Sequence, residues 1–250
     1  MRVLDLFSGL GGFSLGLERA GFRTVGFCEV EPFARRILAK HWPDVPILGD
    51  IRAVGPEQIA ALGSIDVICG GFPCQDISMA GGAAGITGSR SGLWGELLRT
   101  IRLVRPFYAL VENVAALLDR GMGAVVGDLA EIGYDAQWHC IPASAVGAEH
   151  HRDRVWIVSH PDEEHGETRV GILPYDEGTL QQAHHRNRAS VWLASTLPPP
   201  RVADGSTAWL DRRERTEAIG NAVVPQIPEI IGRAIMQQPT SQSSETESHT

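Results

Sequence analysis

The thiol of Cys74 is the side chain in this sequence that is best placed for chemistry. It follows Pro73 shortly after an apolar run, 65–69, and a glycine-rich stretch, 79–92, comes next. A residue just after a buried strand lies at the sheet edge where α/β folds bind ligands, and a thiolate attacks electron-poor carbons. The sequence predicts a nucleophile at Cys74 and a substrate lid at 79–92. The alternatives are an inert buried cysteine and an idle surface loop.

Three charged side chains are predicted to lie near this thiol. Glu112 follows the apolar run 107–111, so its carboxylate should emerge at the same sheet edge and act as an acid. Arg152 and Arg154 alternate at the entry to another apolar run, so both face one way and can hold an anion or a carbonyl. A helix cap or a surface charge is the ordinary alternative for Glu112. Metal-ligand spacing is absent here, so we expect no metal.

A second group of residues favours a nucleoside ligand. The turn 7–12, Phe-Ser-Gly-Leu-Gly-Gly, links a strand to a helix, and Glu29 and Asp50 end the next two predicted strands. Glycines let the backbone approach a ligand, and an acid after the second strand binds ribose hydroxyls. The glycine pattern falls short of the dinucleotide fingerprint, so we expect adenosine without a pyrophosphate. Ordinary turns with surface acids are the alternative.

These residues need a sheet to position them, and the sequence alternates apolar runs with helical periodicity. A mainly parallel, doubly wound α/β fold is predicted, ending in an antiparallel hairpin. The predicted strands are 3–7, 24–28, 45–48, 65–69, 107–111, 135–141 and 154–159. The predicted helices are 12–20, 32–41, 56–62, 92–104, 123–132 and an amphipathic helix 221–236.

Composition limits the class of protein. The chain has 250 residues, a net charge of -8 and four cysteines without framework spacing. It carries no membrane-length apolar run and no signal peptide, so we expect a cytoplasmic protein with reduced thiols. The negative net charge argues only weakly against DNA binding, because enzymes that act on DNA concentrate their positive charge in one cleft.

In combination, these motifs resemble the cytosine-5 DNA methyltransferase family. The resemblance covers residues 3–159 and 218–235 and follows the family's order of motifs. The matching segments are 5–12, Glu29, 49–51, 70–75 with Pro73-Cys74-Gln75, 112–114 with Glu112-Asn113-Val114, Arg152 with Arg154, and 220–225 with Gly-Asn-Ala-Val-Val-Pro.

The resemblance implies a Rossmann-like fold and S-adenosylmethionine as methyl donor, with S-adenosylhomocysteine as product. It implies that Cys74 attacks C6 of a flipped cytosine while Glu112 acts at N3. Arg154 would hold the cytosine carbonyl oxygen, and Arg152 the site or the nearby phosphate. The implied cofactor residues are Phe7, Gly9, Leu10, Gly11, Gly12, Glu29, Val30, Asp50, Ile51, Pro73, Leu93, Asn221 and Val223. The expected DNA-contacting residues are Gln75, Ser78, Arg90, Asn113, Arg186, Arg188 and Arg201.

The predicted domain boundaries follow from the positions where the periodic strand and helix patterns stop and resume, near residues 160 and 218. We expect a catalytic domain at 1–159 plus 218–236, a small recognition domain at 160–217 and a disordered tail at 237–250. Double-stranded DNA is the expected partner of a monomeric bacterial or phage enzyme, with a cognate restriction endonuclease as a further candidate partner. The alternatives are a non-catalytic DNA or cofactor binder, a tRNA methyltransferase and, least favoured, a nicotinamide oxidoreductase.

Overall fold

The computed structural model describes residues 1–73, 92–148, 152–162, 172–173 and 222–238. The predicted lid therefore lies almost entirely outside the described residues. So do eight predicted site residues, namely Cys74, Gln75, Ser78, Arg90, Arg186, Arg188, Arg201 and Asn221.

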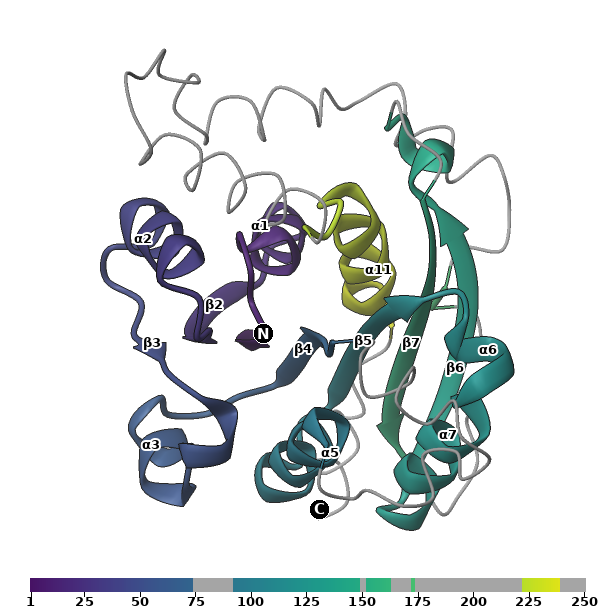
Figure 1. Cartoon of the computed structure of the whole chain (residues 1–250), viewed down its shortest axis with the longest axis horizontal. Coiled ribbons are helices and arrows are strands. Elements are labelled where there is room, and N and C mark those ends of the chain that lie inside the picture. The colour runs from purple at the N-terminus through teal and green to yellow at the C-terminus, as the bar shows by residue number, and fades with distance from the viewer. Residues whose placement is uncertain (74–91, 149–151, 163–171, 174–221, 239–250) are drawn as a thin grey trace, which may run out of the picture.

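A seven-stranded sheet organises the described residues, in the order β3-β2-β1-β4-β5-β7-β6 (Figure 1). The strands are β1 (Arg2–Leu6), β2 (Arg23–Cys28), β3 (Ile47–Leu48), β4 (Val67–Gly71), β5 (Tyr108–Val114), β6 (Tyr134–Pro142) and β7 (Asp153–Pro161). The first five strands are parallel, and β7 pairs antiparallel with both β5 and β6. The predicted mainly parallel, doubly wound sheet is confirmed, and so is its closing hairpin.

Helices cover both faces of this sheet, as a doubly wound fold requires (Figure 1). The longer helices are α1 (Gly12–Arg19), α2 (Pro32–His41), α3 (Pro56–Ala61), α5 (Leu93–Val104), α7 (Met122–Glu131) and α11 (Gln226–Met236). Short turns complete the set, namely η1 (Ile51–Ala53), α6 (Leu117–Arg120) and η4 (Ala143–Val146). The core has two parts, one on each face of the sheet, because successive side chains of a strand point to opposite faces. Leu4 and Leu6 pack with α3, α5 and α7, whereas Val3 packs with α1 and α11.

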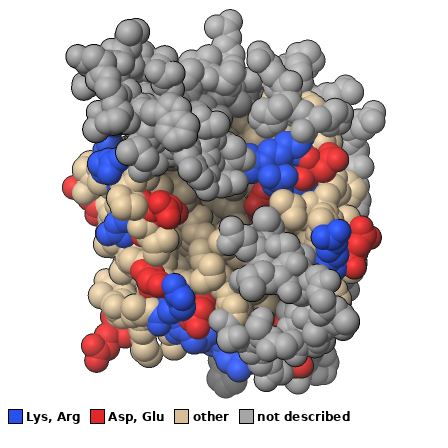
Figure 2. All heavy atoms as spheres, viewed as in Figure 1, with Lys and Arg blue, Asp and Glu red and all other residues tan. Residues whose placement is uncertain are grey.

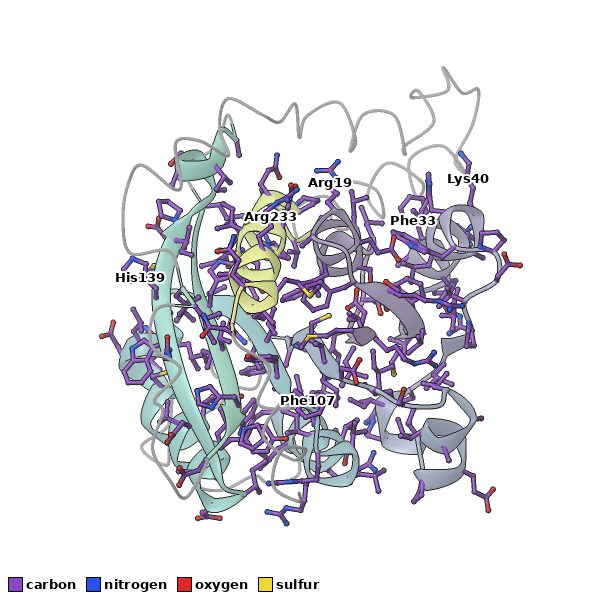
Figure 3. The ribbon with its side chains drawn as sticks, turned by 180° about the vertical axis from the view of Figure 1, so that it is seen from behind. Arg19, Phe33, Lys40, Phe107, His139 and Arg233 are labelled. Atoms are coloured by element: carbon purple, nitrogen blue, oxygen red, sulfur yellow. The ribbon has the colours of Figure 1, made fainter. Side chains whose placement is uncertain are left out.

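The helices α1 and α11 pack closely because α1 has glycines on the contact face. A Cβ on Gly12 would lie 2.3 Å from the carbonyl oxygen of Val223, and one on Gly16 would lie 2.2 Å from that of Pro225. Glu229 pairs with Arg233 at 2.9 Å and with Arg19 at 3.8 Å, and these arginines lie near each other on the two helices in Figure 3. The C-terminal segment is thereby fixed against the first helix.

The predicted start of the C-terminal helix is wrong. The helix begins at Gln226, and residues 222–225 precede it without helical structure. Pro225 explains the boundary, because the residue before a proline is disfavoured in the helical region. The predicted apolar positions of this segment are nonetheless buried, including Ile227, Ile231 and Ile235.

The topology brings distant parts of the sequence to one sheet edge. The parallel strands β1 to β5 all end there, and β7, which runs the other way, begins there. Residues that follow five strands and precede a sixth therefore share this edge, where open α/β sheets bind ligands. None of the helices in the described parts of the chain is long and apolar enough to cross a membrane.

Candidate active site

A cavity of about 620 Å³ opens at this sheet edge. It receives residues from every parallel strand end and from the start of β7. The predicted site residues that line it are Phe7, Gly9, Glu29, Val30, Asp50, Ile51, Pro73, Leu93, Glu112, Asn113, Arg152 and Arg154. The sheet thus brings the predicted nucleoside residues and the predicted catalytic residues into one cavity.

The turn after β1 is held in a strained conformation. Phe7 has φ 52° and Gly9 has φ 53°, both in the left-handed region that non-glycine residues rarely adopt. Strain of this kind persists only where the surroundings enforce it, and it is concentrated at ligand sites. A Cβ on Gly9 would meet no protein atom within 4 Å. The glycine therefore supplies the backbone angle and leaves the cavity side of the turn open.

Glu29 organises the side of the cavity that this turn forms. Its Oε2 accepts a hydrogen bond from the Gly9 amide at 2.7 Å, and its Oε1 accepts from the amides of Val30 at 2.7 Å and Glu31 at 2.8 Å. Glu29 as a whole residue is 8% exposed. A carboxylate has about four acceptor positions, so these bonds fix it and leave capacity for a ligand hydroxyl.

Asp5 lies buried beneath the glycine turn. Its Oδ2 accepts hydrogen bonds from the Ser14 hydroxyl at 2.8 Å and the Ser14 amide at 3.3 Å, which ties β1 to the start of α1. Burial raises the pKa of this carboxyl to about 7, because the bonds from Ser14 and Cys69 offset only part of the desolvation. Asp5 has no cation partner among the described residues.

Asp50 lies at the exposed rim of the cavity and is paired with its neighbour Arg52. The Arg52 guanidinium donates to the Asp50 carboxylate at 2.7 Å, and the Arg52 amide donates to Asp50 Oδ1 at 3.0 Å. These hydrogen bonds hold the pKa of Asp50 below its ordinary value. The Arg52 side chain is 67% exposed, so this pair can open to a ligand at little cost.

The buried Glu112 forms an ion pair with the half-buried Arg154 on another side of the cavity. Glu112 Oε1 lies 2.9 Å from Arg154 Nε, and the two residues come from the adjacent strands β5 and β7. Burial raises the pKa of Glu112, although Arg154 and Arg152 both oppose the shift. A carboxyl with a raised pKa carries a proton more readily, as a general acid must.

Arg152 connects this side of the cavity to the segment before α11. Its Nη1 donates to the Ala222 carbonyl at 2.7 Å, across 70 positions of sequence. Its Nε is buried and has no hydrogen-bond partner among the described residues. Burial, together with the nearby Arg154, lowers the pKa of this guanidinium.

Asn113 fixes the chain that leads toward Cys74. The Asn113 Nδ2 donates to the Phe72 carbonyl at 2.9 Å, while Oδ1 accepts from the Val114 amide at 2.8 Å. The residue is 2% exposed and both atoms of its amide are engaged within the protein. Its predicted contact with DNA therefore stays a prediction, and the observed bonds position the end of β4 against β5.

Four predicted cofactor residues lie behind the cavity rather than on its surface. Leu10 packs with Phe33, Ala34, Ile37 and Ala222. Gly11, with φ 80°, lies against the Trp42 ring, where a Cβ would meet ring carbon at 2.7 Å. Gly12 and Val223 contact each other directly. These residues shape the turn from beneath.

The cavity is also lined by residues to which the sequence analysis assigned no role. They are Cys28, Glu31, Phe33, Ala34, Gly49, Arg52, Gly71, Phe72 and Val114. Most are direct neighbours of predicted residues, so proximity in sequence was the available signal. Cys28 is not a second nucleophile, because burial raises the pKa of its thiol to about 12 and its Sγ donates to the Gly49 carbonyl.

Charge on the visible surface is mixed. Figure 2 shows basic side chains of the described residues next to acidic ones, without a continuous basic face. Among the residues that the structure describes, no group of three or more His, Cys, Asp or Glu side chains could hold a metal ion.

The fold and the cavity define a class of protein. Seven strands in this order, a glycine turn after the first strand and acids after the second and third are typical of Rossmann-like methyltransferases that bind S-adenosylmethionine. The sequence model of the C-5 cytosine-specific DNA methylase family matches residues 1–197. The chain belongs to this family, and the resemblance predicted from the motifs is confirmed.

Several known proteins are similar to the chain over much of its length. The type II methyltransferase M2.BsuMI of Bacillus subtilis is 41% identical over 167 residues, covering 64% of this chain and 42% of that protein. M.NgoFVII of Neisseria gonorrhoeae is 33% identical over 189 residues, covering 70% of this chain and 50% of that protein. The chain thus spans about half the length of such relatives.

Solved structures show the same fold. An E. coli prophage protein described as a DNA modification methyltransferase superposes with a TM-score of 0.63 at 17% identity, covering 94% of this chain and 98% of that protein. The Dnmt2 methyltransferase of S. pombe gives a TM-score of 0.56 at 19% identity, covering 75% of this chain and 56% of that one.

Proposed function

We propose that this chain is a DNA (cytosine-5)-methyltransferase that acts on a cytosine flipped out of duplex DNA, through a covalent bond between Cys74 and C6. Family membership supports the reaction class. The named type II relatives support double-stranded DNA as the substrate and a restriction–modification context. A cognate endonuclease and a monomeric state remain predictions.

One observation carries the proposal. Glu112, with its pKa raised by burial and its Oε1 2.9 Å from Arg154 Nε, lines the same cavity as Pro73, the residue directly before Cys74. Asn113 ties this end of β4 to β5 through the Phe72 carbonyl. An acid, a cation and the approach to the thiol therefore converge at one place.

The chemistry follows from what C5 of cytosine lacks. C5 is a weak nucleophile, so the Cys74 thiolate first bonds to C6 while Glu112 gives a proton to N3 and Arg154 holds the carbonyl oxygen. The electron pair released into the ring makes C5 nucleophilic enough to take up the methyl group. Loss of the C5 proton to a base, return of the N3 proton to Glu112 and breakage of the bond between Cys74 and C6 restore the neutral aromatic ring and both side chains.

The cavity fits S-adenosylmethionine. The Gly9 side is open, Glu29 offers a fixed carboxylate for ribose hydroxyls, and Asp50 at the rim can accept from an adenine amino group. Phe7, Val30, Ile51 and Leu93 supply apolar walls. When bound, this donor supplies the methyl group as an electrophilic sulfonium.

Contacts with DNA are proposed for two segments of the sequence, one that follows Pro73 and one within 160–217. We place target recognition in 160–217, within which Ile172 and Leu173 are fully buried in the core that α1 and α11 cover. The proposed contacts of Gln75, Ser78, Arg90, Arg186, Arg188 and Arg201 concern residues outside the described part of the chain.

A trapping experiment tests the mechanism. The purified chain is incubated with S-adenosylmethionine and a duplex containing 5-fluorocytosine in varied sequence contexts, with a tRNA as the competing substrate. We expect a denaturation-resistant adduct on DNA that Cys74→Ser abolishes. Unchanged methyl transfer by Cys74→Ser would overturn the mechanism, and an adduct only on tRNA would overturn the substrate. Bisulfite sequencing of plasmid DNA from an expressing host would then give the sequence context.

A further inference from the structure

The turn that forms the rim of the cavity has little regular structure of its own. It follows β3, which has two residues, and consists of Asp50 and the short turn η1. Its residues Gly49, Asp50, Ile51 and Arg52 line the cavity on the side where the base of the cofactor is expected. Something beyond the sheet must hold this wall in place.

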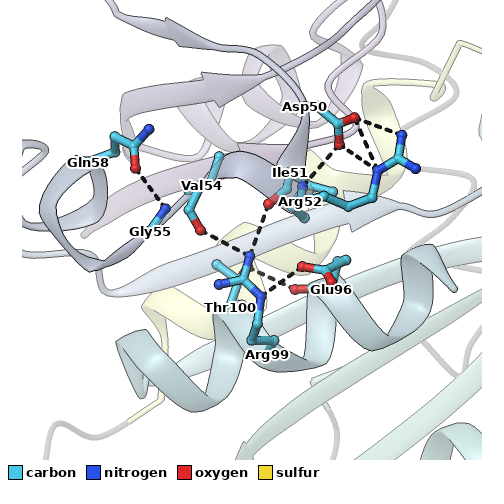
Figure 4. Close-up of polar contacts among 9 residues, drawn as sticks. All are labelled: Asp50, Ile51, Arg52, Val54, Gly55, Gln58, Glu96, Arg99 and Thr100. Carbon is cyan, nitrogen blue, oxygen red and sulfur yellow. Dashed lines mark hydrogen bonds and ion pairs between the residues drawn. The ribbon is translucent and has the colours of Figure 1, made fainter. Parts of the chain in front are cut away.

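Arg99 on α5 holds it. The Arg99 Nη2 donates to two carbonyls of the turn, that of Ile51 at 2.9 Å and that of Val54 at 3.0 Å (Figure 4). These are charge-assisted bonds from one rigid fork to both ends of η1, and they are among the stronger hydrogen bonds in proteins. The guanidinium therefore ties the start and the end of the turn to the helix.

Glu96 in turn holds Arg99. Its Oε2 lies 2.7 Å from Arg99 Nε, one turn earlier on the same helix, and its side chain is 21% exposed (Figure 4). This pair orients the fork before any ligand arrives. The side chains of Ile51 and Val54 are 2% and 4% exposed and pack in the same core as Leu97 and Ile101, which anchors the turn from below.

The helix α5 also contributes directly to the cavity through Leu93, its first residue. The helix α5 therefore supplies one side chain of the cavity lining and the clamp for another part of that lining. A small shift of η1 relative to α5 would move Asp50 relative to Leu93 and change the width of the space between them.

We infer that Arg99, oriented by Glu96, is a positioning residue that sets the base-side wall of the cofactor cavity and thereby the preference for adenine. The inference rests on the proposed function, because it takes Asp50 as the acceptor of the adenine amino group. Arg99 itself does not line the cavity and is not a catalytic residue.

The test compares two ligands on matched variants by calorimetry. The ligands are S-adenosylhomocysteine and S-inosylhomocysteine, which lacks the amino group that Asp50 would bind. We expect Arg99→Gln to raise the dissociation constant of the adenine ligand about tenfold and that of the hypoxanthine ligand less than about threefold. The kcat at saturating methyl donor should stay within about twofold, so that the loss appears in KM.

Further variants keep the inference falsifiable. Glu96→Gln should weaken adenine-ligand binding about threefold, and Arg99→Lys should recover part of the loss, because an ammonium group can reach one carbonyl. Arg102 is an exposed arginine on the same helix, so Arg102→Gln is the control. It should change neither dissociation constant, nor kcat, by more than about twofold.

Equal weakening of both ligands, or unchanged binding by Arg99→Gln, would overturn the inference. A wild-type chain that binds neither ligand would contradict the proposed function instead. In that case amide exchange still tests the clamp, since the Val54 amide donates to the Ile51 carbonyl at 3.1 Å. This amide should exchange faster in Arg99→Gln or Glu96→Gln, and unchanged protection in both variants would contradict the clamp.

Discussion

The two sides of the cavity are built from different kinds of interaction. On the cofactor side, the Glu29 carboxylate is held by three backbone amides, that of Gly9 in the strained turn after β1 and those of Val30 and Glu31. On the catalytic side, Glu112 is held by the side chain of Arg154, with Arg152 nearby. A backbone N–H donor is lost only when its residue is replaced by proline, whereas a guanidinium is lost in any substitution of the arginine. The cofactor side should therefore tolerate change around it better than the catalytic side.

The largest expected effect is on the catalytic side, at Glu112. Glu112→Gln keeps the size of the side chain but removes the proton donor, so kcat for methyl transfer should fall about a thousandfold. The dissociation constant of S-adenosylhomocysteine should stay within about threefold, since Glu112 is not on the cofactor side. Stopped assays with labelled donor and calorimetry measure the two quantities. Glu57→Gln, an exposed glutamate on α3, is the control, and a matching loss of cofactor affinity would show that the two sides are not separable.

A second comparison concerns two buried carboxyls, of which only one has a cation. Glu112 has arginines beside it. Among the described residues, the hydrogen bonds to the carboxyl of Asp5 come only from Ser14 and Cys69, and burial raises the pKa of Asp5 to about 7. The protonated form of Asp5 stabilises the fold fully below the unfolded pKa, near 4. This contribution is lost as the pH rises through the folded value, and the shift from 3.8 to about 7 corresponds to at most about 4 kcal/mol.

Urea unfolding of the wild-type chain and Asp5→Asn at pH 5, 6, 7 and 8 tests this expectation. Between pH 5 and pH 8 the free energy of unfolding of the wild-type chain should fall relative to that of Asp5→Asn, which cannot titrate. Asp135→Asn removes an exposed carboxyl and should leave the wild-type profile unchanged. Parallel profiles for the wild-type chain and Asp5→Asn would mean that Asp5 ionises normally.

The cofactor side could be predicted from sequence in more detail than the catalytic side, and the reason is local. Gly9 and Glu29 each lie one to three residues beyond a strand end, so their place at the sheet edge follows from the strand pattern alone. The fold class follows from the same pattern. The alternation of strands and helices is a local signal that tertiary packing did not override.

What could not be predicted depends on contacts between distant segments. The ion pair between Glu112 and Arg154 requires β7 to insert between β5 and β6, an order that the sequence does not encode locally. The bond from Arg152 to Ala222 spans 70 positions. Nothing in the sequence indicates the positioning role of Arg99, because an arginine in an amphipathic helix is ordinarily a solvent-facing charge. The start of the last helix was misplaced because Pro225 outweighs the apolar periodicity around it.

On the cofactor side, Glu29→Gln should have an intermediate effect. The amide oxygen can still accept some of the backbone bonds, but the NH₂ group faces an amide donor that is left without a partner. We expect the dissociation constant of S-adenosylhomocysteine to rise about thirtyfold, with kcat at saturating donor reduced less than about threefold. Calorimetry and initial rates measure these quantities, with Glu57→Gln again as the control. A loss confined to kcat would contradict the assignment of this side to the cofactor.

The smallest effect should come from adding one methyl group beside the catalytic acid. A Cβ on Gly71 would lie 2.8 Å from Glu112 Oε2, so Gly71→Ala must displace that carboxylate. We expect kcat to fall about fivefold, because a misplaced acid transfers its proton less efficiently, while cofactor affinity stays within about twofold. Gly123→Ala on α7 is the matched control, since its added Cβ would meet no atom within 4 Å. If Gly71→Ala retained full kcat, the carboxylate of Glu112 would have room to move without consequence, and the catalytic side would be as tolerant of change as the cofactor side.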